Sequence, residues 1–305
     1  MSIRLTLMGP QLAQDCIDKT RQLATAHGAE IAAEKWLASR SDAGWQQEQG
    51  ECLRFTLDAG VETGKVVSGL RRDALALSGD NGIDLVVEQP DPWRGRRKLV
   101  CFDMDSTLIQ AEVIDELARV HGVYDEVAAV TASAMRGEID FKQSFTQRMA
   151  TLEGLSESTL ASIAESLPLM PGAERLFRVL KERGYHTAII SGGFTYFARY
   201  LQQRLDIDEI HANELVIDSG RVTGAVREPI VDAARKAQLL SGIARKRHFD
   251  MGQTVAVGDG ANDLQMLATA GLGVAFHAKP LVREQARQSI SSLGLDALLY
   301  LLDEG

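Results

Sequence analysis

Two aspartates, Asp103 and Asp105, follow a short apolar run in the stretch LVCFDMDST. Residues two apart in an extended segment point to the same side, so both carboxylates face one site. Two like charges this close repel each other, and one would take up a proton unless a cation lay between them. Carboxylate oxygens are ligands that suit Mg²⁺, and a carboxylate can also act as a nucleophile. The pair therefore indicates a metal site, a nucleophile, or both.

A second stretch, SGGF, offers groups that suit a phosphate. Ser191 brings a hydroxyl, and Gly192 lets the backbone approach a ligand closely. Exposed backbone N–H groups at the start of a predicted helix are a natural cradle for an anion. Lys236 opens a later predicted helix and can bring a positive charge to the same phosphate. Together these groups predict a phosphate site with a metal and a carboxylate nucleophile beside it.

A third stretch, GDGAND, adds the carboxylates of Asp259 and Asp263 and the amide of Asn262. Asp259 joins the first pair as a third acid, and such an oxygen-rich set is typical of a Mg²⁺ site. Each motif alone is common, a D-x-D pair in loops and caps and the other two in turns. Their order, and the position of all three after an apolar run, argue against coincidence.

The elements that must position these groups alternate along the chain. The motifs end three short apolar runs, KLVCFDMD, YHTAIISGG and QTVAVGDG, which we interpret as strands. Helices are predicted between and beyond them, at residues 173–183, 195–205, 233–246 and 262–270. This alternation predicts an α/β fold, a doubly wound Rossmann-type domain with a mainly parallel sheet. Ligands of such sheets bind outside the C-terminal ends of the strands, where the motifs lie.

A long helical segment separates the first of these strands from the next helix of the core. It spans roughly sixty residues, far more than an ordinary connection between two elements. We interpret residues 112–167 as a helical cap inserted into the domain. The core with its cap then occupies residues 98–305.

Residues 1–90 have a pattern of their own. Strands and helices are predicted in the order β-α-β-β-α-β, at residues 3–8, 11–27, 30–38, 52–58, 66–77 and 83–88. This ferredoxin-like α+β order resembles ACT-type regulatory domains, which bind amino acids or dimerise. ACT ligand sites commonly use a glycine and an acidic residue after the first strand, and the loop MGPQL has no acid. A dimerisation or packing module is the interpretation we favour.

The boundary between the two parts is predicted at residues 91–97. The surrounding stretch, QPDPWRGRRK, contains two prolines, one glycine and four basic residues. Such a composition is typical of a linker. A chain of 305 residues is long enough for two domains, each with its own core.

The composition excludes several classes of protein. The net charge of −9 argues against nucleic acid or an anionic membrane as a partner, although a small basic site for an anionic substrate can remain. Three cysteines without paired spacing, Cys16, Cys52 and Cys101, fit a reducing compartment and no structural zinc. The N-terminus has too short an apolar stretch for a signal peptide, and no run reaches transmembrane length. We therefore expect a cytoplasmic protein.

The chain from residue 98 onward resembles the haloacid dehalogenase (HAD) superfamily of phosphotransferases. The stretches DMDST, SGG, the later lysine and GDGAND match its four motifs in order. DMDSTL, AMRGEIDFKQSFTQRMATLEGL and YHTAIISGGFTYFA are similar to the phosphoserine phosphatase branch of that superfamily. The resemblance implies a Mg²⁺-dependent hydrolase that converts O-phosphoserine to L-serine and phosphate through an aspartyl-phosphate, the last step of serine biosynthesis.

The resemblance also implies a role for each motif residue. Asp103 would attack phosphorus, and Asp105 would protonate the leaving oxygen and then activate water. The implied metal ligands are Asp103, the backbone carbonyl of Met104, Asp105 and Asp259, although the main role of Asp105 is at the substrate. The implied phosphate-binding residues are Ser191, Gly192, Lys236 and Asn262, with Asp263 orienting the lysine and metal region.

In the cap, the resemblance implies partners for the amino-acid part of the substrate. Glu112 would bind the ammonium group. Arg148 would bind the carboxylate, to which a guanidinium offers two hydrogen bonds. Met135 and Phe141 would close an apolar lid that excludes water during transfer. Without the resemblance, these residues would be assigned to a solvated helix face and to ordinary packing of the cap.

Two other functions remain open. One is a phosphatase or phosphotransferase for another small phosphomonoester, and Glu112 with Arg148 argues against substrates that lack an amino-acid backbone. The other is a non-catalytic amino-acid sensor, and the intact set of Asp103, Lys236 and Asp259 argues against it. The expected partner is the small-molecule substrate. Formation of a homodimer through residues 1–90 is left as an open alternative.

Overall fold

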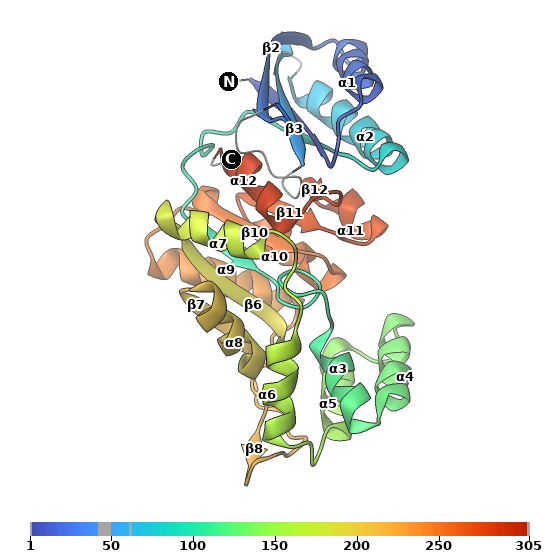
Figure 1. The fold of residues 1–305 in the computed structure, drawn as a ribbon, viewed down its shortest axis with the longest axis vertical. Coiled ribbons are helices and arrows are strands. Elements are labelled where there is room, and N and C mark those ends of the chain that lie inside the picture. Colours follow the sequence, from blue (N-terminus) through green and yellow to red (C-terminus); the bar gives the residue numbers. More distant parts are fainter. Residues whose placement is uncertain (1, 42–49, 61–62, 304–305) are drawn as a thin grey trace.

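The computed structural model of the chain describes residues 2–41, 50–60 and 63–303. Within them lie a four-stranded sheet, a six-stranded sheet and a two-stranded hairpin. Figure 1 shows the four-stranded sheet at one end of the long axis and the helices α3 to α6 toward the other, with the six-stranded sheet between them.

The four-stranded sheet is antiparallel, in the order β2-β3-β1-β4. Its part of the chain comprises β1 (Ile3–Gly9), α1 (Gln14–Ala26), β2 (Glu30–Ala38), β3 (Glu51–Asp58), α2 (Thr63–Asn81) and β4 (Asp84–Glu88). Alternate strand residues such as Leu5, Leu7 and Phe55 share one apolar core with residues of both helices. The β-α-β-β-α-β order predicted from the sequence is confirmed.

The six-stranded sheet is parallel, in the order β12-β11-β10-β5-β6-β7. Its strands are β5 (Leu99–Phe102), β6 (His186–Phe194), β7 (Glu209–Asn213), β10 (Thr254–Gly258), β11 (Leu272–Phe276) and β12 (Gln288–Ile290). The helices around it are α7 (Ala173–Glu182), α8 (Thr195–Leu205), α9 (Ala233–Lys246), α10 (Leu264–Thr269), α11 (Pro280–Gln285) and α12 (Leu298–Leu302). The predicted doubly wound α/β core is confirmed, with β5 inside the sheet.

Strand β5 shows why this sheet is buried on both faces. Val100 and Phe102 belong to one core, in which the rings of Phe102 and Phe177 lie 4.9 Å apart. Leu99 and Cys101 belong to a second core, together with residues of α9 and α10. A short and wholly apolar strand is typical of a parallel sheet that helices cover on both sides.

The cap lies between β5 and α7. It consists of α3 (Val113–His121), α4 (Tyr124–Met135), α5 (Phe141–Thr151) and α6 (Glu157–Ser166). Helix α5 begins with a capping box, in which Asp140 and Gln143 each accept a backbone N–H of the other. The predicted helical character of residues 112–167 is therefore confirmed. The small hairpin β8 (Ile217–Asp218) and β9 (Arg221–Val222), which the sequence did not predict, lies near α6 (Figure 1).

The two sheets meet at a seam between β4 and β12. Asp84 of β4 accepts the backbone N–H groups of Ser291 at 2.9 Å and Ser292 at 2.8 Å. The side-chain amide of Gln288 donates to the carbonyl of Val87 at 3.0 Å. Since these bonds join residues some 200 positions apart, the seam fixes the four-stranded sheet to the edge of the core.

The predicted linker, residues 91–97, is packed against the core. The guanidinium of Arg97 donates to the carbonyl of Gly252 and pairs with Asp91. Trp93 also lies over Gly252, because a Cβ atom at that glycine would lie 2.1 Å from the indole nitrogen. A division of the chain into two domains at this segment stays a prediction.

All three cysteines are buried and unpaired. No helix in the described part of the chain is long and apolar enough to cross a membrane.

Candidate active site

Asp103 and Asp105 lie where β5 ends. The N–H of Asp103 bonds to the carbonyl of Val257 on β10 at 2.9 Å, so this residue still follows the ladder. Asp103 is buried and Asp105 is half-buried. A Cβ atom on Gly193 would lie 2.5 Å from Oδ2 of Asp105, and only glycine allows this approach. The structure therefore brings Asp105 against the SGGF stretch.

Lys236 is the cation of the site. It lies in the first turn of α9 and is fully buried. Its Nζ is 2.9 Å from Oδ1 of Asp103 and 2.7 Å from Oδ1 of Asp263. Burial acts to lower the pKa of Lys236, but the two carboxylates more than offset this and raise it. Lys236 is thus a fixed positive charge beside Asp103.

Asp259 and Asp263 complete an acidic cluster. One carboxylate oxygen of each lies within 4.8 Å of one oxygen of Asp103. Burial, followed by the charges of Asp103 and Asp263, raises the pKa of Asp259 to about 7. One buried lysine leaves this cluster with excess negative charge, which a divalent cation with oxygen ligands would neutralise. The residues present therefore fit a divalent metal.

Asp263 holds other groups in place. Its Oδ1 bonds to Lys236, and its Oδ2 accepts the N–H of Gly260 at 3.0 Å. Asp259 has one hydrogen bond among the described residues, from the hydroxyl of Thr107 at 3.2 Å. Asp259 therefore has more capacity left for a metal than Asp263 does.

The SGGF stretch forms the last residues of β6. Ser191 is buried, and its Oγ accepts the N–H of Gly193 at 2.9 Å. The carbonyl of Gly192 accepts the side-chain amide of Asn213 at 2.8 Å, and Oδ1 of Asn213 accepts the N–H of Val231 at 2.8 Å. Asn213 thus joins the predicted phosphate loop to the segment that leads into α9 and Lys236.

Sequence reasoning missed Asn213 and Thr107. Both are buried and polar, and each donates a hydrogen bond to a site residue or to the loop that carries one. Asn213 ends β7, so its place at a strand end was a usable signal, but the run EIHAN is too polar to read as a strand. Thr107 follows the DMDS stretch directly, and nothing in its spacing distinguishes it from a turn residue.

Met104 and Asn262 are the predicted site residues whose contacts with metal and phosphate are not tested by the hydrogen bonds of the acidic cluster. The carbonyl of Met104 accepts the N–H groups of Thr107, Leu108 and Ile109, the closest at 2.8 Å. Its metal contact therefore stays a prediction. Asn262 is half-buried, and its Oδ1 lies over Gly260, 2.1 Å from where a Cβ atom would be. Its contact with phosphate also stays a prediction.

The cap is tied to the acid pair at its root. The first N–H of α3, from Val113, donates to Oδ1 of Asp105 at 3.0 Å. Glu112 accepts the hydroxyl of Ser106 at 2.8 Å. Burial, then the charges of Glu112 and Asp103, raise the pKa of Asp105. Glu112 therefore lies close enough to the acid pair to act electrostatically on it.

The other predicted cap residues differ in position. The ring of Phe141 reaches the SGGF stretch, because a Cβ atom on Gly192 would lie 3.3 Å from its Cζ. Arg148 is part-buried; burial lowers its pKa, while Asp115, Glu112 and Asp105 act in the opposite direction. Met135, at the end of α4, is 73% exposed, so its lid role stays a prediction.

Comparison with known proteins places this site in a family. A family model for haloacid dehalogenase-like hydrolases matches residues 100–268. A phosphoserine phosphatase of Streptomyces coelicolor is 48% identical over 80% of this chain and 58% of its own length. Those of Archaeoglobus fulgidus and Haemophilus influenzae are 43% and 45% identical, over 82% and 75% of this chain and 72% and 73% of their own.

Solved structures agree with these relatives. A HAD-family hydrolase of Salmonella enterica matches 99% of this chain and 98% of its own, with a TM-score of 0.84 and 31% identity. A probable phosphoserine phosphatase of Vibrio cholerae matches 99% of this chain and 86% of its own, with a TM-score of 0.76 and 35% identity. A substrate-bound phosphoserine phosphatase matches 67% of this chain and 98% of its own, with a TM-score of 0.63 and 38% identity. This chain belongs to the haloacid dehalogenase-like hydrolases.

Proposed function

We propose that this chain hydrolyses O-phosphoserine to L-serine and phosphate, the last step of serine biosynthesis, with Asp103 as the nucleophile. The observation that carries this is the pairing of buried Asp103 with buried Lys236 at the end of β5, in a chain 43–48% identical to phosphoserine phosphatases. One of the similar solved structures is a substrate-bound phosphoserine phosphatase, which is consistent with this proposal.

Asp103 would attack phosphorus from a position that its hydrogen bonds fix. Its Oδ1 is held by Lys236 and by the N–H of Met104 at 2.7 Å, so the carboxylate cannot rotate freely. An oxygen of Asp103 would form a bond to phosphorus as the bond from phosphorus to the serine oxygen breaks. Lys236 would counter the negative charge that develops on the transferring phosphoryl group.

Asp105 would move the protons of both steps. Its raised pKa, caused by burial and by Glu112 and Asp103, favours a protonated carboxyl that can donate to the departing serine oxygen. The carboxylate that remains would then take a proton from water, which attacks phosphorus and breaks its bond to Asp103. Phosphate leaves and Asp103 is restored as a carboxylate.

Mg²⁺ is the metal we assign to the acidic cluster. Asp103 and Asp259 would hold it, with the Met104 carbonyl and Asp105 as further predicted contacts. When bound, the ion would neutralise the crowded carboxylates and the phosphoryl oxygens. The test is thermal unfolding: Mg²⁺ should raise the midpoint of the wild type and raise that of Asp259→Asn much less. Equal stabilisation of both proteins would contradict the assignment.

The phosphate and amino-acid groups of the substrate would be bound separately. Ser191, the N–H of Gly192, Lys236 and Asn262 would hold phosphate oxygens, with Asp263 fixing the lysine. Glu112 would bind the ammonium group and Arg148 the carboxylate, while Phe141 and Met135 cover them. The position of Phe141 over Gly192 supports a closed cap.

The experiment that tests the function is phosphate release from a panel of phosphomonoesters, with Mg²⁺ and with a chelator. Phosphoserine should be used at least about tenfold more efficiently than phosphomonoesters without an amino-acid backbone, since two charged contacts favour it. A broader preference would identify a phosphatase for another small phosphomonoester. Phosphoserine binding without turnover would identify a sensor.

Residues 1–90 are proposed as an ACT-like regulatory or dimerisation domain, linked to the phosphatase domain at 98–305 through residues 91–97. Solved phosphoserine phosphatases that cover 67% of this chain align over 98% of their own length. A third of this chain therefore has no counterpart in them, which supports a role outside the chemistry. Sedimentation of the full chain tests the dimer, and a monomer at all concentrations would contradict it. The unpaired cysteines support a cytoplasmic location.

A further inference from the structure

A cavity of about 590 Å³ lies at the seam between the two sheets, away from the acidic cluster. Residues of helix α2 and strand β4 form one wall, and residues of and after α11 form the other. Four arginines line it, two from each wall: Arg71, Arg72, Arg283 and Arg287. In a chain of net charge −9, such a concentration of positive charge calls for an explanation.

Most of this charge is not neutralised within the described part of the chain. Arg71, Arg283 and Arg287 form no ion pair there, and Arg71 makes one long hydrogen bond, to the carbonyl of Val87 at 3.4 Å. Arg72 pairs with its neighbour Asp73 on α2. Burial lowers the pKa of Arg71, and the nearby charge of Arg287 lowers it further. The two walls thus present like charges to each other.

The acidic residues of the cavity do not balance these charges. Asp84 is buried and accepts the N–H groups of Ser291 and Ser292 and the hydroxyl of Ser292. Glu284 is exposed on α11 and forms no ion pair within the described residues. The lining therefore keeps an excess of positive charge.

Two buried polar atoms beside the cavity have no hydrogen-bond partner among the residues that the structure describes. They are Nε of Arg283 and Oε1 of Gln288, a residue only 6% exposed. Buried polar atoms are nearly always hydrogen-bonded, and one left without a partner costs free energy. Apolar side chains, among them those of Leu75, Leu85 and Ala286, also line the cavity. The cavity thus combines an apolar surface with unused cationic donors.

We propose that this seam cavity binds a small organic anion with an apolar body and a carboxylate or phosphate group. A guanidinium matches either group with two hydrogen bonds, and arginines from both walls can share one anion. The volume lies within the range of small-molecule sites, which are mostly apolar with a few placed polar groups. The anion removes the repulsion between Arg71 and Arg287 and joins α2 to the segment that follows α11.

This cavity is separate from the catalytic site. The cavity is formed by the four-stranded sheet and the edge of the core, whereas the cap lies toward the other end of the molecule (Figure 1). A ligand that binds only when both walls are in place stabilises their contact by linkage.

Calorimetric titration of the full chain tests the proposal, in buffer with a chelator. The probes are phthalate and phenylphosphonate, which share an apolar ring and carry carboxylates or a phosphonate, with neutral benzamide as control. We expect at least one anion to bind and benzamide not to bind. Arg71→Gln/Arg287→Gln should weaken that binding by at least about tenfold, because a charged hydrogen-bonding partner is lost from each wall.

Two further variants make the result specific. Arg245→Gln/Arg247→Gln removes the same charge from exposed positions at the end of α9 and should bind as the wild type does. Ala76→Trp, at an exposed position of α2 that lines the cavity, should block binding without removing charge, even if the double variant fails to fold. No binding of either anion to the wild type would overturn the proposal. Binding that both cavity variants retain would overturn it as well, since it would place the anion outside the cavity.

Discussion

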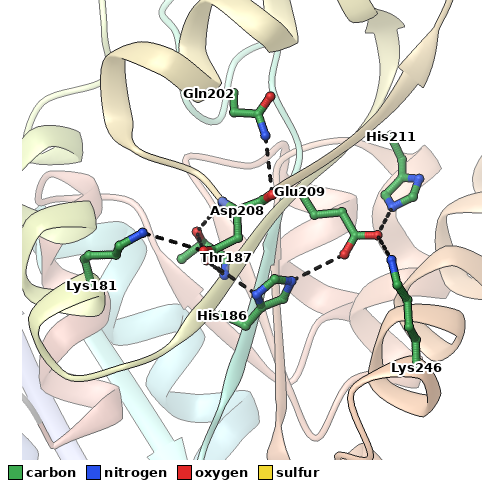
Figure 2. A network of polar contacts seen from close by, with 8 residues as sticks. All are labelled: Lys181, His186, Thr187, Gln202, Asp208, Glu209, His211 and Lys246. Atoms are coloured by element: carbon green, nitrogen blue, oxygen red, sulfur yellow. Dashed lines mark hydrogen bonds and ion pairs between the residues drawn. The ribbon is translucent and has the colours of Figure 1, made fainter.

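The two ends of the six-stranded sheet carry acidic clusters that are built differently. At the C-terminal end of the strands lie Asp103, Asp105, Asp259 and Asp263, and one lysine, Lys236, pairs with Asp103 and Asp263. At the opposite end, Asp208 and Glu209 meet two histidines and two lysines (Figure 2), which are His186, His211, Lys181 and Lys246. The first cluster has one lysine for four carboxyl groups, whereas in the second Asp208 and Glu209 have two lysines, Lys181 and Lys246.

The pKa values follow this difference. Burial and like charges raise the pKa of Asp105 and Asp259. Burial also acts to raise the pKa of Asp208, but hydrogen bonds from the N–H and hydroxyl of Thr187, at 2.8 and 3.0 Å, lower it overall. Glu209 behaves similarly, because His211, His186 and Lys246 outweigh its burial. The charges of Asp208 and Glu209 are neutralised, and we call these two residues and their partners the satisfied cluster. Such a cluster stabilises the fold, whereas a cluster with excess negative charge can bind a metal and a substrate.

The largest expected effect comes from removing one acid from each cluster. Asp103→Asn should lower kcat/KM for phosphoserine by at least about a thousandfold, because the amide is a poor nucleophile and a poor metal ligand. Asp208→Asn, the matched change at the other end of the sheet, should alter kcat/KM by no more than about twofold. Circular dichroism must show that both variants are folded. Substantial Mg²⁺-dependent turnover by Asp103→Asn would refute the nucleophile assignment.

The second effect concerns substrate choice in the cap. Arg148→Ala should reduce kcat/KM for phosphoserine by roughly tenfold to a hundredfold, the cost of losing one charged hydrogen-bonding partner. It should reduce the use of p-nitrophenyl phosphate little, since that substrate has no carboxylate. Arg136→Ala is the control, because Arg136 is exposed on the cap and pairs with Glu138. Equal losses for both substrates would show that Arg148 supports the cap or the phosphate.

The sequence predicts the residues that end the strands, but it does not predict the partners that come from distant parts of the chain. Asp103, Ser191 and Asp259 end apolar runs, so their convergence follows from the topology of a parallel sheet. The partners that tune them do not follow from local pattern. Asn213 reaches Gly192 from a neighbouring strand 21 positions later in the chain, through a polar run that shows no strand periodicity.

The cluster in Figure 2 could not be predicted from the sequence either. His186 and His211 show no ligand-like spacing, and only the pairing of β6 with β7 brings Glu209 between them. The seam cavity likewise needs two segments about 200 positions apart. Spacing within a segment predicts which groups share a face, whereas the neutralisation of their charge is decided by distant parts of the chain.

Strand β7 joins the two clusters, which gives a third and smaller effect. It begins at Glu209 in the satisfied cluster and ends at Asn213 in the site. Asn213→Ala removes the bonds to Gly192 and Val231 and should lower kcat by about tenfold, mainly through misplacement of the phosphate loop. Glu209→Gln should lower the unfolding temperature and leave kcat within about twofold. If both variants lost activity in proportion to stability, Asn213 would be a structural residue only.

The smallest effect is the response of the satisfied cluster to acid. The pKa of Asp208 and of Glu209 is lowered in the folded state, so the unfolded chain binds more protons as the pH falls. The stability that these carboxylates contribute is therefore fully present above their ordinary values of 3.8 and 4.5 and is lost as the pH falls through the lowered values. Urea unfolding of the wild type and Asp208→Asn at pH 7, 5, 4 and 3 measures this contribution.

The two proteins should differ by about 1 kcal/mol at pH 7, and the difference should shrink as the pH falls below 3.8, the ordinary pKa of Asp208, toward its lowered value. Asp218→Asn, on the exposed hairpin, makes the same charge change beyond the reach of the cluster and should follow the wild type at every pH. A difference for Asp208→Asn that stays constant from pH 7 to pH 3 would mean that the carboxylate acts through its shape and neutral hydrogen bonds. The contrast between the two ends of the sheet would then be one of packing and not of charge.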